Sequence, residues 1–286
     1  MLKILIKIYS RIYYFCHYSL GFNLKGLGFI ISFIKKPYIV EFKSYKMIIE
    51  PRVSGAYGLL AGGLVSEPET HRILNFIDSN IKEQYYFVDI GASIGEFVLL
   101  MASKEKVLNV LAYEPNKKEC ESIINSANLN SFSNIIIKSK AVYDKTGLIE
   151  FNFSDKSLVG SSIFKDEINA KSHTEQVEVV TLNEELKDLK ENMIILMDIE
   201  GAELGAIKGG LKIINSIKPL IIFEYNLKSK KYFKLSEIKD ALNEDYELYK
   251  LRTDGKLVQE FSNTQNIVAV NKKSLFYEPI QKLILK

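Results

Sequence analysis

Acidic side chains follow three apolar runs of this 286-residue chain, each where a strand of a parallel sheet is expected to end. They are Asp89, Glu114 and Asp198. An acid at the end of the second strand of such a sheet can accept hydrogen bonds from a ribose hydroxyl. The three carboxylates therefore predict a site for a nucleotide-like ligand at one edge of a sheet.

A glycine turn accompanies the first of these acids, in the sequence Asp89-Ile-Gly91-Ala92-Ser93-Ile-Gly95. Glycine permits positive φ and lets a ligand lie close to the backbone, while the free N–H groups of the helix start can bind polar groups. The spacing differs from the G-x-G-x-x-G of dinucleotide enzymes. A tight strand-to-helix turn also needs glycine in proteins that bind nothing, so the turn alone leaves both readings open.

The rest of the chain alternates between apolar runs and helical segments. We predict strands over 85–90, 107–113, 134–139, 192–198, 219–225, 246–252 and 266–270, with helices over 116–129, 203–216 and 236–243. Such alternation is typical of a doubly wound α/β fold with a parallel sheet. Ligands of these sheets bind beyond the carboxyl ends of the strands, where Glu224 also falls.

Four segments resemble the FkbM-type family of S-adenosylmethionine-dependent methyltransferases. They are residues 88–95, Tyr113-Glu114-Pro115, Met197-Asp198-Ile199-Glu200-Gly201-Ala202-Glu203 with the glycines at 209–210, and residues 218–224. Their order and spacing fit over about residues 60–272. Ser93 departs from the pattern, since the family often has asparagine there.

The resemblance implies a Rossmann-like class I methyltransferase fold, with a mostly parallel sheet of seven strands whose final strand is antiparallel. It implies S-adenosylmethionine as cofactor and O-methylation of a sugar, glycan or other small natural product. The cofactor-binding residues it suggests are Asp89, Gly91, Ala92, Ser93, Gly95, Glu114 and Asp144. Asp144 follows the third strand, where a residue of class I enzymes commonly approaches the adenine. Residues 144–147 also fit an ordinary turn, and Ala141 or Val142 offer an alternative contact.

Transfer of a methyl group to a hydroxyl requires in-line positioning and removal of a proton, which a carboxylate can accept. Asp198 is the first candidate for this role, with Glu200 or Glu224 assisting. The same cluster offers the oxygen ligands that Mg²⁺ prefers, but acids two residues apart at a strand end are more often substrate ligands or helix caps. We therefore assign no metal site and do not favour Mg²⁺.

Three further residues are weaker substrate-site candidates: Glu67, His173 and Glu203. Glu67 begins an expected entrance helix, where it could equally serve as a cap. His173 lies in an insertion read as a lid at about 148–180 and could act as a base near neutral pH or be a solvated loop residue. Glu203 starts a helix, where it could simply complement the helix dipole.

The first forty residues form a basic, apolar arm with six lysines and arginines and no acid before Glu41. Residues 2–15 place Lys3, Lys7 and Arg11 at helical spacing among apolar side chains. Such a helix can lie on anionic lipid, or it can pack on the catalytic domain or a second subunit. The apolar run 27–34 is too short to span a bilayer.

We divide the chain into an arm (1–36), a strand hairpin with the entrance helix (37–80), a methyltransferase domain (81–275) and a tail (276–286). Two cysteines without metal or redox spacing indicate a reducing, cytoplasmic setting, with peripheral contact at the inner face of the membrane as an option. A net charge of +3 is too small to indicate a nucleic-acid partner. A homo-oligomer, a non-catalytic binding or scaffold module, and a nucleotide-sugar or nicotinamide enzyme remain alternatives.

Overall fold

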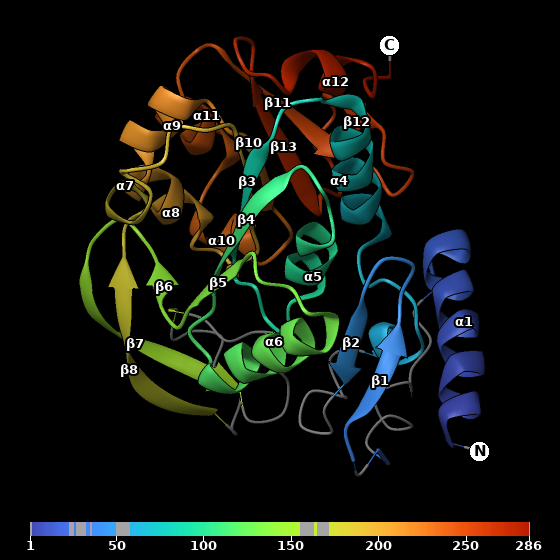
Figure 1. Cartoon of the computed structure of the whole chain (residues 1–286). Coiled ribbons are helices and arrows are strands. Elements are labelled where there is room, and N and C mark those ends of the chain that lie inside the picture. Colours follow the sequence, from blue (N-terminus) through green and yellow to red (C-terminus); the bar gives the residue numbers. More distant parts are fainter. Residues whose placement is uncertain are drawn as a thin grey trace.

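The centre of the fold is a mixed sheet flanked by helices (Figure 1). The computed structural model describes residues 2–22, 26, 33–34, 36–49, 58–154, 163–164 and 172–285. Parts of the predicted arm (23–25, 27–32 and 35) and of the predicted lid (155–162 and 165–171) lie outside the described residues.

Among the described residues the central sheet has eight strands in the order β12-β11-β13-β10-β9-β3-β4-β5. Their bounds are β3 (Tyr85–Ile90), β4 (Val107–Tyr113), β5 (Ile135–Lys138), β9 (Met193–Met197), β10 (Leu220–Glu224), β11 (Tyr246–Leu251), β12 (Leu257–Val258) and β13 (Asn266–Asn271). Strands β5, β4, β3, β9 and β10 pair in parallel, and β13 is antiparallel to both β10 and β11. The predicted parallel sheet with an antiparallel final strand is confirmed, and the two-residue β12 extends its edge.

Alternate residues of each central strand enter two different cores, as the period of two along a strand requires. Phe87 packs with α4 (Pro68–Asn80), α5 (Glu96–Ala102) and α12 (Tyr277–Gln281) on one face of the sheet. Val88 packs with α8 (Glu203–Gly209), α9 (Leu211–Ile217) and α11 (Leu235–Ala241) on the other. Burial on both faces explains the continuous apolar runs from which the strands were predicted.

The single helix predicted over 203–216 is two helices, α8 and α9, which meet at Gly210. A Cβ added at Gly209 would lie 2.1 Å from the Tyr143 carbonyl oxygen. The chain therefore needs a glycine where the helix ends against residue 143. The helix α6 (Lys117–Asn130) ends as predicted, within a residue.

A smaller sheet in the order β6-β8-β7 follows β5 and forms the insertion (Figure 1). Its strands are β6 (Ala141–Val142), β7 (Gly147–Ser154) and β8 (Ser172–Val180), and β7 and β8 pair antiparallel over their lengths. A four-residue helix, α7 (Leu182–Glu185), leads back to β9, and α10 (Ser229–Tyr232) follows β10. The role of this insertion as a lid stays a prediction.

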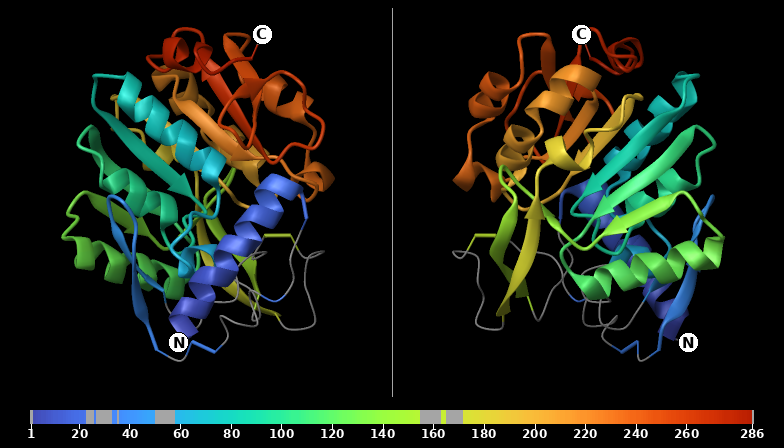
Figure 2. Two further views of the ribbon diagram at one scale, coloured as in Figure 1. Left: turned by 90° about the vertical axis from the view of Figure 1, so that its right-hand side faces the viewer. Right: turned by 60° about the vertical axis from the view of Figure 1, so that its left-hand side comes forward.

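The N-terminal part contains α1 (Leu2–Leu20), the hairpin β1 (Tyr38–Glu41) and β2 (Lys46–Ile49), and α3 (Gly58–Ala61). The left view of Figure 2 shows α1 running along the outside of the molecule. Ile6 and Ser10 of α1 are fully buried, and Ser10 Oγ donates a hydrogen bond to the Gly58 carbonyl oxygen at 3.0 Å. One face of α1 therefore packs on this same chain, as one of the two readings of the arm expected. None of the helices in the described part of the chain combines the length and apolar content needed to cross a bilayer.

Candidate active site

A cavity of about 300 Å³ opens where β3, β4 and β9 end. Asp89, Glu114 and Asp198 all line it, so the three acids that follow the strands do lie together. The volume is at the lower end of the range for small-molecule sites. The predicted convergence of strand-end acids therefore produces one candidate site.

The glycine turn after β3 forms one wall of the cavity and contacts the chain next to both Glu114 and Asp198. Gly91 has φ +87°, and a Cβ added to it would lie 2.0 Å from the Asp198 carbonyl oxygen. Gly91 N–H and Ala92 N–H both donate to the Tyr113 carbonyl oxygen, at 2.9 and 3.1 Å. The turn that follows β3 is thus held against both neighbouring strand ends, and only glycine fits at position 91.

Ser93 and Gly95 complete the turn in left-handed backbone conformations. Ser93 has φ +50°, in the region where asparagine is favoured among residues with a side chain. This backbone geometry explains why the FkbM-type family, which this chain resembles, often has asparagine at this position. Gly95 caps α5 with φ +87° but does not itself line the cavity.

Glu114 is a buried carboxylate fixed by backbone donors. Ser93 N–H donates to its Oε2 at 2.9 Å and Asn116 N–H donates to its Oε1 at 2.8 Å. Burial raises the pKa of Glu114, while these backbone bonds oppose the rise. Its position and orientation are therefore determined before any ligand arrives.

Asp89 lies beside Glu114 and is only 3% exposed. Its Oδ2 atom has no hydrogen-bond partner among the described residues. Burial, and then the nearby Glu67, Glu114 and Glu96 carboxylates, raises the pKa of Asp89. An unpartnered buried acceptor at the cavity wall is suited to a donor supplied by a ligand.

The acids after β9 and β10 are crowded together. Asp198 lines the cavity and is accessible to solvent there. Desolvation by the surrounding protein, and then the nearby Glu224 and Glu67 carboxylates, raise its pKa well above the ordinary value. Burial and then Glu200 raise the pKa of Glu224 to about 8. Glu224 does not line the cavity, and its Oε2 has no hydrogen-bond partner among the described residues.

Glu200 and Glu203 differ in how they are held. Glu200 lines the cavity with φ +57°, and its carboxylate pairs with Lys228 Nζ at 3.0 Å. Glu203 is fully buried outside the cavity lining, and its Oε1 accepts hydrogen bonds from Ile199 N–H at 3.1 Å and Gly201 N–H at 3.2 Å. Glu203 therefore shapes the loop that carries Asp198, which favours the structural reading of this residue.

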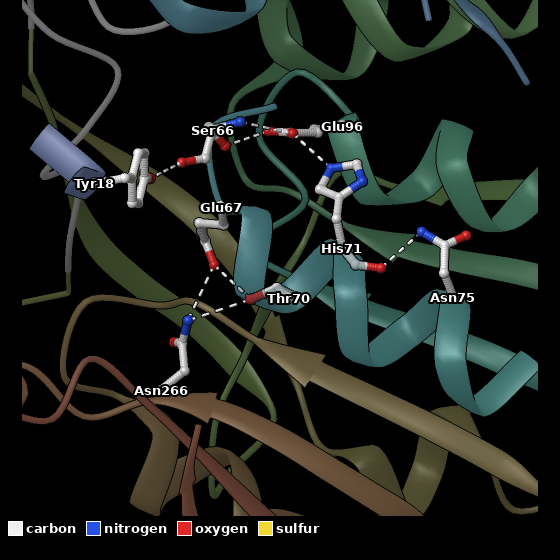
Figure 3. Close-up of polar contacts among 8 residues, drawn as sticks. All are labelled: Tyr18, Ser66, Glu67, Thr70, His71, Asn75, Glu96 and Asn266. Atoms are coloured by element: carbon white, nitrogen blue, oxygen red, sulfur yellow. Dashed lines mark hydrogen bonds and ion pairs between the residues drawn. The ribbon is translucent and has the colours of Figure 1, made fainter. Parts of the chain in front are cut away.

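Ser66 and Glu67, which precede β3 in the chain, also line the cavity, and Figure 3 shows their polar contacts. Glu67 lines the cavity, and its Oε2 accepts hydrogen bonds from Thr70 Oγ1 at 2.9 Å and Asn266 Nδ2 at 3.1 Å. It makes no side-chain cap to the helix that it precedes. Burial and then Glu96 raise the pKa of Glu67 to about 7. These contacts favour the site reading of Glu67 over simple capping.

Sequence reasoning missed the group around Glu96, which also lines the cavity (Figure 3). The Glu96 carboxylate accepts hydrogen bonds from Ser66 N–H at 2.9 Å and from the Ser66 hydroxyl, and its Oε1 lies 2.7 Å from His71 Nε2. Tyr18 of α1 donates from its hydroxyl to the Ser66 carbonyl oxygen at 2.6 Å. The N-terminal helix is therefore hydrogen-bonded directly to Ser66, which lines the cavity.

Like Gly95, Glu203 and Glu224, the predicted site residues His173 and Asp144 lie outside the cavity lining. His173 lies on β8, where its side chain is half exposed and 3.3 Å from Glu175, so the geometry does not support a base role. Asp144 follows β6, whose own residues Ala141 and Val142 line the cavity instead. Of the two positions predicted for an adenine contact, residues 141–142 are therefore the one that lies at the cavity.

The cavity is strongly acidic. Among the described residues that line it, seven are Asp or Glu, and Lys140 is the one lysine or arginine. Lys140 Nζ is itself 2.7 Å from Glu178 Oε1. In the part of the chain that the structure describes, no three His, Cys, Asp or Glu side chains converge as ligands for a metal ion. The excess of acidic over basic lining residues favours a positively charged ligand.

Comparison with known proteins identifies the family to which this site belongs. Residues 89–249, more than half of the chain, match the family model described as the methyltransferase FkbM domain. The chain belongs to the FkbM methyltransferase family. The matched range includes the turn after β3 and the loop after β9, so the family predicted from these motifs is confirmed.

Solved structures of methyltransferases are similar to this FkbM-family chain. The FkbM methyltransferase of Methylobacillus flagellatus KT is 21% identical to this chain, with a TM-score of 0.44. The match covers 65% of this chain and 43% of that one, so this chain spans less than half of that protein. An rRNA methylase from Streptococcus thermophilus is 10% identical, with a TM-score of 0.41, over 72% and 98% of the two chains. M. jannaschii TYW2 in complex with AdoMet is 13% identical, with a TM-score of 0.42, over 84% and 87%. No curated protein matches this chain.

Proposed function

We propose that this chain is an S-adenosylmethionine-dependent methyltransferase that acts on a hydroxyl group of a sugar, glycan or other small natural product. The observation that carries the proposal is the single cavity in which Glu114, Asp89 and Asp198 meet beside the glycine turn. Family membership supports methyl transfer as the reaction. When bound, S-adenosylmethionine supplies the methyl group from a positively charged sulfonium.

The residues of the cavity fit this cofactor. Glu114, fixed by two backbone donors, offers its remaining lone pairs to ribose hydroxyls. The unpartnered Asp89 Oδ2 offers a further acceptor at the same wall. Ala141, Val142 and Phe151 contribute apolar surface for a flat adenine ring. The excess of lining carboxylates favours a cation such as the sulfonium or an amino group.

Asp198 is the residue that we propose to act on the acceptor. It lines the cavity, and its raised pKa makes its carboxylate a stronger base than an ordinary aspartate. In its ionised form it can orient the acceptor hydroxyl and take its proton as the oxygen attacks. Glu200 and Glu224 assist by raising the pKa of Asp198, and Glu200 is held by Lys228.

We propose a small-molecule or glycan acceptor and no catalytic Mg²⁺. The net charge of +3 offers little general attraction for a nucleic acid. Asp198 can itself accept the proton of the acceptor hydroxyl, so the proposed step requires no metal ion.

Calorimetric titration of the full chain with S-adenosylmethionine, S-adenosylhomocysteine and NAD⁺ tests the proposal. We expect both adenosyl ligands to bind and NAD⁺ not to bind. Asp89→Asn should weaken adenosyl binding about tenfold or more, whereas Asp188→Asn, at an exposed aspartate outside the cavity, should not change it.

Binding of NAD⁺ alone would point to a nicotinamide enzyme, and binding of no ligand by folded protein would point to a scaffold module. After adenosyl binding is established, transfer of a labelled methyl group to a panel of hydroxylated sugars identifies the acceptor class. Labelling of nucleic acid but of no sugar or small molecule would overturn the proposed acceptor.

A further inference from the structure

The N-terminal helix α1 has two different long faces. Its inner face is fixed to the body of the protein by the buried Ile6 and Ser10 and by the hydrogen bond from the Tyr18 hydroxyl to the Ser66 carbonyl oxygen. The left view of Figure 2 shows the helix at the outside of the molecule. Its outer face is therefore presented on a firmly attached element.

The outer face of α1 is apolar although it is exposed. Its exposed side chains are Ile4 (65%), Leu5 (49%), Ile8 (53%), Ile12 (49%) and Phe15 (57%). The steps of four, four and three residues from position 4 to position 15 keep them on one side of the helix. Large apolar side chains gathered on an exposed face mark an interaction surface.

Positive charge borders this apolar face. Lys7 and Arg11 are exposed and lie along one edge of it, one turn apart. Lys3 lies one turn before Lys7, over the ring of Tyr38 at 4.8 Å from the ring centroid. The helix contains no aspartate or glutamate. A basic edge beside an apolar face fits a partner with an anionic surface and an apolar layer beneath that surface.

We infer that the outer face of α1 binds the surface of an anionic lipid bilayer, with the helix lying in the plane of the interface. The apolar side chains enter the boundary between headgroups and acyl chains, while Lys7 and Arg11 pair with anionic headgroups. A second copy of the chain is a poorer partner, because a twofold contact would bring the same basic edges together without an acid on either helix. This inference is independent of the methyltransferase proposal.

Co-sedimentation of the full chain with vesicles tests this inference. Vesicles of phosphatidylcholine with phosphatidylglycerol are compared with vesicles of phosphatidylcholine alone. We expect at least tenfold stronger binding to the anionic vesicles. Each basic residue near such a surface adds to the affinity, and two such residues together add a factor on the order of tenfold. Lys7→Gln with Arg11→Gln should remove about that tenfold preference.

The apolar face is tested with a matched control. Ile8→Gln with Ile12→Gln should lower binding to anionic vesicles by more than about tenfold, because apolar insertion is lost. Ile124→Gln alters an apolar residue of α6 that is similarly exposed (45%) and should leave binding unchanged. Since all three isoleucines are exposed, thermal unfolding should stay within a few degrees of the wild-type protein.

Three results would overturn the inference. One is the absence of wild-type binding to anionic vesicles, and another is an equal loss of binding in the Ile124→Gln control. The third is a dimer, seen by sedimentation velocity, that Ile8→Gln with Ile12→Gln dissociates while no vesicle binding occurs. That third result would assign the face to self-association instead.

Discussion

Glu114 and Asp198, which line two sides of the cavity, lie in different environments. On the side of β3 and β4, Glu114 accepts two backbone hydrogen bonds, which fix its orientation. On the side of β9 and β10, Glu224 lies close enough to raise the pKa of Asp198, and Glu224 Oε2 has no hydrogen-bond partner among the described residues. We interpret the first side as a binding surface and the second as a place where protons are taken and released.

Gly91→Ala should have the largest effect, because Gly91 is where the two sides touch. The added Cβ would meet the Asp198 carbonyl oxygen at 2.0 Å, and φ is +87°. We expect a loss of stability of about 3 kcal/mol or more from strain and overpacking together. Denaturant unfolding measures this loss.

Gly147→Ala is the matched control, since Gly147 also has positive φ, at +146°, but no atom lies within 4 Å of its added Cβ. It should cost only about 1 kcal/mol. Equal losses in the two variants would show that the contact at Gly91 does not join the two sides.

Asp198→Asn should abolish most of the turnover while the cofactor still binds. Loss of a base lowers the rate by about a hundredfold or more. Labelled methyl transfer to the best acceptor of the panel gives the rate. Wild-type turnover in Asp198→Asn would remove the proton-transfer role from this side of the cavity.

Glu203→Gln should change how stability depends on pH. Burial raises the pKa of Glu203 from 4.5 to about 7, so the folded protein keeps a proton that the unfolded chain has lost. The free energy of unfolding should therefore fall as pH rises from 4.5 to 7, by on the order of 3 kcal/mol from this residue. Denaturant unfolding at several pH values should show a shallower fall in the variant.

Glu237→Gln is the control for that effect. Glu237 also lies in the first turn of a helix, and its carboxylate accepts a hydrogen bond from Lys234 N–H at 2.9 Å, but it is exposed. It should leave the pH dependence as it is in the wild-type protein. An identical pH profile in Glu203→Gln and wild type would contradict the assignment of the proton to Glu203.

Tyr18→Phe should have the smallest effect, a loss of stability of about 1 kcal/mol from one hydrogen bond. Because that bond holds Ser66 of the cavity wall, affinity for S-adenosylmethionine should fall about twofold to fivefold in calorimetry. Tyr14→Phe is the control, because it removes a hydroxyl from a ring that lies 4.6 Å from the Tyr18 ring on the same helix. Equal affinity in Tyr18→Phe and wild type would exclude α1 from the site.

The strand-end acids could be predicted from sequence because local patterns determine them. Each buried strand is a continuous apolar run, and the carboxyl ends of parallel strands meet at one edge of the sheet, so Asp89, Glu114 and Asp198 had to converge. The same reasoning gave the order of elements, whereas the antiparallel final strand was expected from the resemblance to the FkbM-type family. The break between α8 and α9 was missed because it depends on a contact with residue 143.

The wall around Glu96 could not be predicted, because its residues are distant in sequence and carry no shared pattern. Glu96 contacts Ser66 and His71, which lie 30 and 25 residues earlier, and Tyr18 lies 48 residues before Ser66. Only the packing of α1 and α4 brings them together. Asp144 lies two residues beyond β6, whose residues line the cavity, because the pattern marks the end of a strand less sharply than its middle.

Calorimetric titration of S-adenosylmethionine into Glu114→Gln and Asp198→Asn tests the division between the two sides most directly. Glu114→Gln should raise the dissociation constant about tenfold or more, because it weakens hydrogen bonds to the fixed carboxylate. Asp198→Asn should leave the dissociation constant within about threefold of wild type, since that side acts on the acceptor. Loss of binding in Asp198→Asn with normal binding in Glu114→Gln would contradict the division.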